Sequence, residues 1–121
     1  IIAKGTNRVT ATNDPTAHAE VVAIREACKV LGSFQLEGCE LYTSCEPCPM
    51  CLGAIYWARP EKIYYANTKA DAAAIQFDDQ FVYDEMAKPI SERQLFTQQM
   101  LRDEALVAFR AWETSVQKKA Y

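Results

Sequence analysis

The sequence predicts an α/β domain, and three features of its first half support that prediction. Apolar residues recur at helical spacing over about residues 15–31. Two short segments rich in β-forming residues, 40–44 and 62–66, flank a second stretch of helical length at 48–58. A strand, helix, strand succession of this kind implies a right-handed parallel crossover. We therefore expect a parallel strand pair with helices packed against it.

Length and composition indicate one domain with a core of its own. The chain has 121 residues, of which 50% are hydrophobic and 24% are charged. No apolar run approaches the length of a membrane span, and no segment reads as a signal peptide, so we expect a cytoplasmic protein with no membrane partner. The net charge of −3 argues against a nucleic-acid partner, because proteins that grip the phosphate backbone usually present a basic surface.

Local signals set the expected limits of the elements in the N-terminal part. Residues 1–3 read as a strand and residues 5–13 as a turn or loop. Asp14 is the expected N-cap of the first long helix, with Pro15 at its first helical position. Gly32 is the expected C-cap of that helix.

The C-terminal part is expected to hold smaller elements. Pro60 ends the second helix, and short helices are predicted at 71–74 and 79–87. Residues 93–101 are predicted to form a last strand. A capped amphipathic helix then closes the chain, with Asp103 as its cap and Leu106, Phe109 and Trp112 on its apolar side.

Five cysteines are present, and their odd number and spacing do not suggest a disulfide framework. Cys28 lies on the apolar face of the first long helix and is interpreted as a small buried hydrophobic residue. Cys39 and Cys45 flank a predicted strand and receive the same interpretation. None of these three is expected to bind a ligand.

The other two cysteines, Cys48 and Cys51, follow Pro47 at the start of the second helix. Residues at i and i+3 share a helix face, so both sulfur atoms can reach one metal ion. The helix dipole favours negative charge in the first turn and therefore favours thiolates there. Two thiolates do not complete a zinc site, so the rest of the chain has to supply another ligand.

His18, the only histidine, is the candidate for that ligand, and Glu20 stands two residues after it. A spacing of two puts side chains on opposite sides of a regular helix, but in the first turn both can converge above the helix end. One histidine and two cysteines are the ligand count of a catalytic zinc site with its fourth position open to water. Glu20 is then free to move a proton from that water. The alternative is a structural zinc site with Glu20 as an ordinary solvated charge.

The pattern H-x-E…P-C-x-x-C is the signature of the zinc deaminases, and 18–20 and 47–51 match it without departure. Segments 13–20, 42–59, 77–79 and 118–121 extend the likeness, and the chain resembles the bacterial guanine deaminases of the cytidine/deoxycytidylate deaminase superfamily. The related tRNA adenosine deaminases usually carry leucine at the position of Cys45 and a more basic C-terminal helix.

The resemblance implies a three-layer α/β/α cytidine-deaminase-like fold with a mixed central sheet. Residues 1–121 are expected to form a single zinc-dependent deaminase domain that is N-terminally incomplete, since the family's first helix and first strand precede the strand expected at the start of this chain. The resemblance also implies a homodimer, with exchange of the C-terminal segment between subunits as a hypothesis.

The implied reaction converts guanine and water to xanthine and ammonia in purine catabolism or salvage. One Zn²⁺ per subunit would activate the water that attacks C2, and Glu20 would protonate N3 and then carry a proton to the departing amine. The resemblance implies Asp79 as a second catalytic group and substrate contact, with a role as a proton relay near the amino group. The remaining implied substrate contacts are Asn7, Ala19, Trp57 and Tyr121.

Plainer interpretations stand beside these roles: a loop-capping Asn7, an exposed Asp79, a core Trp57 and a frayed Tyr121. Two other functions also remain open. One is a tRNA adenosine deaminase, or another nucleobase or nucleoside deaminase, that uses the same zinc chemistry. The other is a non-catalytic zinc-stabilised module that only binds a partner.

Overall fold

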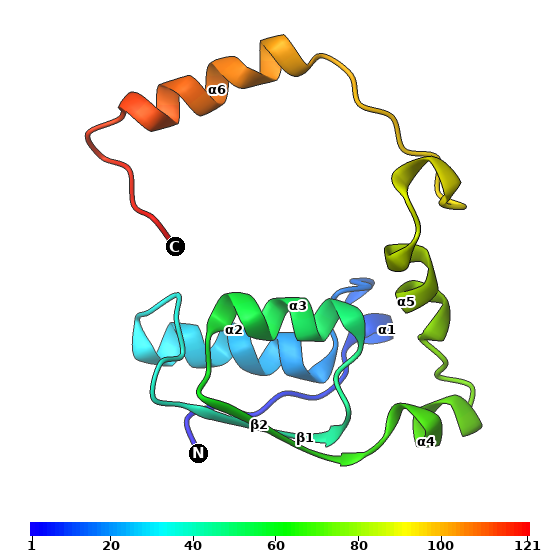
Figure 1. The fold of residues 1–121 in the computed structure, drawn as a ribbon. Helices are drawn as coiled ribbons and strands as arrows, with labels where there is room; N and C mark the ends of the chain where they lie inside the picture. Colours follow the sequence, from blue (N-terminus) through cyan, green and yellow to red (C-terminus); the bar gives the residue numbers. More distant parts are fainter. The chain divides into compact units, whose positions relative to one another are not determined.

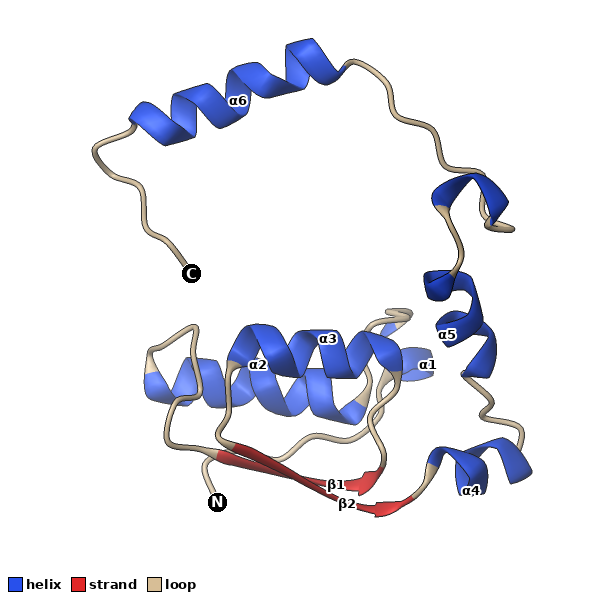
Figure 2. Cartoon of the chain, viewed as in Figure 1, coloured by secondary structure: helices blue, strands red, loops and turns tan.

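Two parallel strands joined through a helix form the centre of the first half of the chain. The computed structural model describes residues 1–121, and β1 (Glu40–Cys45), α3 (Pro49–Ala58) and β2 (Lys62–Asn67) follow one another in it. The strands pair in parallel, with a register that runs from Glu40 opposite Lys62 to Cys45 opposite Asn67. Figure 1 and Figure 2 show this crossover. The α/β prediction and the parallel pairing are confirmed.

The helix α2 (Ala19–Leu31) packs against α3, and both helices lie on one side of the strand pair (Figure 1). Alternate residues of β1 are exposed and half-buried, as expected for a strand with one covered face. A small core of Ala27, Leu36 and Ala58 joins the two helices, and Ile55 of α3 is only 2% exposed. This packing places the N-termini of α2 and α3 near each other.

The start of α2 differs from the prediction. The helix begins at Ala19 with His18 at its N-cap, four residues after the expected start at Pro15. Asp14 holds a turn and does not cap the helix, since its Oδ1 accepts a hydrogen bond from the Thr16 backbone N–H at 2.8 Å. The predicted C-cap is confirmed, because Gly32 adopts a left-handed conformation with φ of 61°.

The N-terminal stretch also departs from expectation. Residues 1–3 form no strand, because no hydrogen-bonded partner strand lies beside them in the described chain. The stretch expected to be loop contains a short helix, α1 (Val9–Thr12).

The chain divides into two compact units, Ile1–Asp84 and Glu85–Tyr121. The helices α4 (Lys69–Ala74) and α5 (Gln80–Ala87) follow β2, close to their predicted positions. The second unit contains the 3₁₀ helix η1 (Ile90–Glu92) and α6 (Arg102–Thr114).

Two predictions for the second unit are wrong. Residues 93–101 form no strand, because the only strand pairing in the described chain is that of β1 with β2. Asp103 lies inside the first turn of α6, and Leu101 occupies the cap position with φ of 53°. None of the helices combines the length and the apolar character needed to cross a bilayer.

Candidate metal centre

The N-terminal ends of α2 and α3 supply the three candidate metal ligands. His18 is the N-cap residue of α2 and Cys48 is the N-cap residue of α3, and both have an extended backbone. Cys48 Sγ accepts a hydrogen bond from the Cys51 backbone N–H at 3.5 Å, so it caps the helix as a side-chain oxygen often does. Pro49 occupies the first turn, whereas Pro47 lies before the helix and is buried.

The structure brings the three side chains together. One ligand atom from each of His18, Cys48 and Cys51 lies within 4.8 Å of the others, and His18 Nδ1 is 3.6 Å from Cys48 Sγ. Cys51 is fully buried, and the other two residues are half-buried. The cluster therefore opens toward solvent on the side of His18 and Cys48.

Hydrogen bonding and charge make the two cysteines unequal. The pKa of Cys48 is lowered to about 6, mainly because the Cys51 thiol donates to its sulfur, with further help from the Cys51 and Met50 N–H groups and the His18 charge. The pKa of Cys51 is raised by its bond to Cys48, by burial and by the Glu20 carboxylate. Cys48 is thus the more readily deprotonated of the two cysteines.

The donor set fits a zinc ion. Tetrahedral zinc with two sulfur ligands and one imidazole nitrogen requires ligand atoms separated by roughly 3.3–3.8 Å. The 3.6 Å between His18 Nδ1 and Cys48 Sγ falls in that range, and the largest separation of 4.8 Å needs only a small closure. A cation here replaces the proton that Cys51 holds. Three protein ligands leave one position of a tetrahedron open.

Glu20 lies beside this cluster and is held from two sides. Its Oε2 lies 3.5 Å from Cys51 Sγ, and its Oε1 accepts a hydrogen bond from Thr43 Oγ1 at 3.5 Å. The Thr43 hydroxyl also lies 3.0 Å from the carbonyl oxygen of Cys45. The carboxylate is therefore next to the metal ligands without being one of them.

Thr43 is a site residue that the sequence reasoning missed. It stands on the half-buried face of β1, between Leu41 and Cys45. A polar residue on the covered face of a strand is a signal that can be found in a sequence, because buried polar groups need a hydrogen-bond partner.

Tyr83 of α5 is a second missed residue. Its pKa is raised by burial first and then by the nearby charges of Asp79, Glu46 and Cys48. Asp79 is half-buried and directly precedes α5. Asp79, Glu46 and Cys48 thus each lie within electrostatic range of the Tyr83 hydroxyl.

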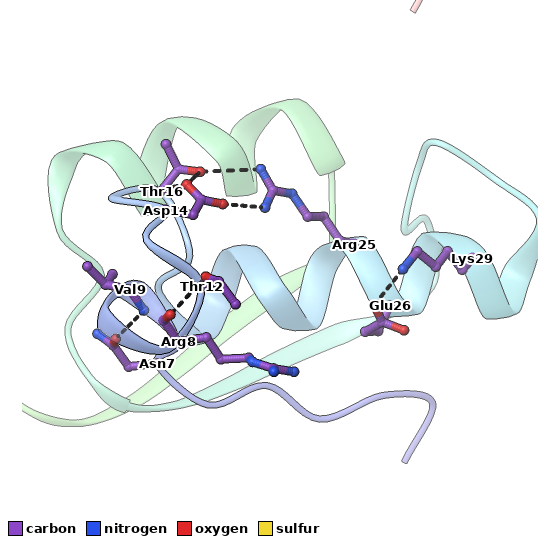
Figure 3. Close-up of polar contacts among 9 residues, drawn as sticks. All are labelled: Asn7, Arg8, Val9, Thr12, Asp14, Thr16, Arg25, Glu26 and Lys29. Carbon is purple, nitrogen blue, oxygen red and sulfur yellow. Dashed lines mark hydrogen bonds and ion pairs between the residues drawn. The ribbon is translucent and has the colours of Figure 1, made fainter.

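The structure locates the other predicted contacts without testing their roles. Asn7 Oδ1 accepts a hydrogen bond from the Val9 N–H at 3.0 Å, which is the loop-capping contact of the plainer interpretation (Figure 3). Trp57 lies near the end of α3 and is 65% exposed, so it is not a core residue. Tyr121 is 73% exposed and belongs to the second unit.

A cavity of about 690 Å³ between α2 and β1 reaches the carboxylate. Ala19, Glu20 and Thr43 are among its lining residues, and none of the three metal ligands is. Residues 1–5 form a further part of the lining.

Comparison with known proteins agrees with this geometry. Residues 1–67 match the family described as the cytidine and deoxycytidylate deaminase zinc-binding region. Guanine deaminase of Bacillus subtilis is 60% identical over 121 residues, which cover 100% of this chain and 78% of that protein. The X-ray structure of that enzyme superposes with a TM-score of 0.97 and covers 100% of this chain and 77% of its own.

A tRNA-specific adenosine deaminase of Agrobacterium fabrum is 43% identical over 76 residues, which cover 63% of this chain and 50% of that protein. The similarity to the Agrobacterium enzyme therefore covers only part of the chain, whereas the similarity to the Bacillus subtilis enzyme covers the whole chain. The predicted cytidine-deaminase-like fold is confirmed. With its family match and its cluster of one histidine and two cysteines, this chain belongs to the cytidine and deoxycytidylate deaminase family.

Proposed function

We propose that this chain is a zinc-dependent guanine deaminase that converts guanine and water to xanthine and ammonia. The observation that carries the proposal is the Glu20 carboxylate, 3.5 Å from Cys51 Sγ, beside three ligand atoms that lie within 4.8 Å of one another. Guanine is favoured as the substrate because the similarity to a guanine deaminase extends over 100% of this chain. The tRNA-specific adenosine deaminase matches 63% of it.

His18, Cys48 and Cys51 would hold one zinc ion per chain. When bound, zinc supplies Lewis-acid activation of a water molecule. Glu20 accepts a proton from this water while the water oxygen bonds to C2 of guanine, and it gives a proton to ring N3. Glu20 then delivers the second water proton to the exocyclic nitrogen, the C2–N bond breaks, and ammonia leaves.

Further contacts to the purine are assigned to the residues implied by the resemblance. We assign polar contacts to Asn7 and to Asp79, which is half-buried directly before α5. Ala19 is supported by its place in the lining of the cavity beside Glu20. Trp57 is assigned to the pocket wall and Tyr121 to its closure.

We also propose a homodimer in the cytoplasm. Helix α6 has no buried residue, and Phe109 and Trp112 are 75% and 51% exposed, so this helix offers an apolar surface for a second copy. None of the five cysteines forms a disulfide, which suits a reducing compartment.

Zinc analysis combined with ammonia release tests the proposal. The purified chain is incubated with guanine, adenine, cytosine, cytidine and a tRNA anticodon stem-loop. We expect one zinc ion per chain and ammonia from guanine alone. Activity only on the stem-loop would replace the proposal with a tRNA deaminase. Zinc binding without turnover of any substrate, with Glu20 intact, would indicate a binding module.

A further inference from the structure

The loop that carries His18 is tied to α2 by a cluster of three side chains, Asp14, Thr16 and Arg25, which we call the loop bracket (Figure 3). Arg25 Nη1 lies 3.4 Å from Asp14 Oδ2, and Arg25 Nη2 lies 3.3 Å from Thr16 Oγ1. Asp14 Oδ1 in turn accepts hydrogen bonds from the Thr16 N–H at 2.8 Å and the Thr16 hydroxyl at 2.7 Å. The two arms of one guanidinium thus hold Asp14 and Thr16 of the loop.

Backbone hydrogen bonds carry this constraint from the bracket to His18. The Ala17 N–H donates to the Asp14 carbonyl at 3.1 Å, and the His18 N–H donates to the Thr16 carbonyl at 2.8 Å. The Ala17 carbonyl accepts from the Arg8 N–H at 2.9 Å, and the Ala17 side chain is buried. His18 is therefore fixed on one side by this loop and on the other by the first turn of α2.

The bracket is too exposed to be explained as a major source of stability. The side chains of Arg25 and Asp14 are 54% and 37% exposed, and ion pairs of such exposure contribute little to folding because water screens them. Its geometry has a different consequence. Arg25 stands two turns along the helix that His18 caps, so it anchors the loop to the element on which the imidazole must be aligned.

We propose that Arg25, acting through Asp14 and Thr16, is a positioning residue that aligns His18 as a zinc ligand. The inference rests on the proposed zinc site. A planar guanidinium suits this role because its fixed fork reaches two acceptors at once, whereas a lysine ammonium is a single point of charge. Groups that orient metal ligands typically alter metal affinity by about 10–100-fold when they are removed.

The test compares Arg25→Met with Lys29→Met. Lys29 lies on the same helix and pairs with Glu26 at 2.7 Å, so its loss also removes one cation and one exposed ion pair but leaves the loop untouched (Figure 3). Zinc affinity is measured by competition with a chromophoric chelator, and the melting temperature is measured for the metal-free chains. We expect Arg25→Met to bind zinc about tenfold more weakly than Lys29→Met, with a similar metal-free melting temperature. Arg25→Lys should fall between Arg25→Met and the unchanged chain.

A second pair of variants tests the same inference without altering charge. Thr16→Val removes the hydroxyl from the bracket, and Thr12→Val removes a hydroxyl that donates to the Arg8 carbonyl at 2.9 Å (Figure 3). Thr16→Val should weaken zinc binding and Thr12→Val should not. Cobalt substituted for zinc gives a second readout, since a misaligned imidazole changes the visible absorption of the bound ion.

Equal zinc affinity within both pairs would overturn the inference. So would a fall in the metal-free melting temperature of Arg25→Met large enough to account for the weaker binding, because the bracket would then be structural. A chain that binds zinc normally but leaves guanine unchanged would overturn only the proposed function. A chain that binds no zinc would overturn both.

Discussion

Glu20 is the one carboxylate in direct contact with a candidate metal ligand. Its contacts allow a substitution that separates proton transfer from metal binding. Glu20→Gln keeps the shape of the side chain and an oxygen for the Thr43 hydroxyl, but an amide does not shuttle protons. We expect the variant to retain zinc and to lose turnover by roughly 10²–10⁴-fold. Metal analysis and the initial rate of ammonia release measure the two effects separately. Unchanged turnover would remove Glu20 from its proposed role.

The neighbouring cysteines offer a matched pair of substitutions. Cys48→Ala removes one of the three clustered ligand atoms, whereas Cys45→Ala removes a half-buried thiol outside the cluster that donates to the Thr68 carbonyl at 3.8 Å. We expect Cys48→Ala to lose zinc and to melt at a lower temperature than the zinc-loaded parent, because metal binding stabilises the folded chain. Cys45→Ala should keep its zinc. Loss of zinc from both variants would show that the effect is not one of ligation.

How far single residues could be predicted depends on whether their partners are near in sequence. His18, Cys48 and Cys51 were predictable because each stands at a helix start, where the local pattern identifies both the residue and its direction. Thr43 was not predicted, because its importance arises from a contact with Glu20 that only the fold creates.

At the scale of the elements, the first turn of α2 lies directly against the backbone of Gly5. A methyl group added at Gly5 would meet the Ala19 carbonyl oxygen and would lie 2.7 Å from the Ala23 backbone nitrogen. Both are backbone atoms, so the turn that carries His18 and Glu20 would have to shift. We expect Gly5→Ala to lower the free energy of unfolding by about 1–3 kcal/mol and to weaken zinc binding.

Gly53 is the control for that substitution. It lies in α3, and a methyl group built there meets no atom within 4 Å. Alanine is the better helix former, so Gly53→Ala should raise the free energy of unfolding by about 0.5–1 kcal/mol and leave zinc binding unchanged. Chemical denaturation of the metal-free chains compares the two variants. Equal stability of Gly5→Ala and Gly53→Ala would contradict the close approach of residue 5 to α2.

The predicted helix and strand limits are wrong where a local sequence signal is compatible with more than one structure. Asp14 and Pro15 are a sound helix start in sequence terms, yet Asp14 closes a turn with Thr16 and leaves the cap position to His18. The strands predicted at 1–3 and 93–101 need a partner strand, and β-propensity within a segment does not supply one. Elements whose evidence is local, such as β1, α3 and β2, were predicted within one residue of their observed limits at every end.

Over the chain as a whole, the first unit carries all the residues of the metal cluster, whereas Tyr121 belongs to the second unit. If Tyr121 closes a pocket, it closes either that of its own chain or that of the partner subunit. Two variants, each of which lacks one of the required side chains, distinguish these cases. Glu20→Gln lacks the proton-transfer group, and Tyr121→Ala lacks the terminal ring.

If Tyr121 acts in the partner subunit, co-expression of these two inactive variants restores activity. A mixed dimer then contains one site with Glu20 from one chain and Tyr121 from the other, and random pairing places about a quarter of all sites in this arrangement. If Tyr121 acts in its own chain, no site of the mixed dimer is complete. We expect about a quarter of the parental rate of ammonia release per chain, with neither variant active alone. An inactive mixture of proven mixed dimers would assign Tyr121 to its own subunit, and full activity of Tyr121→Ala alone would remove it from the pocket.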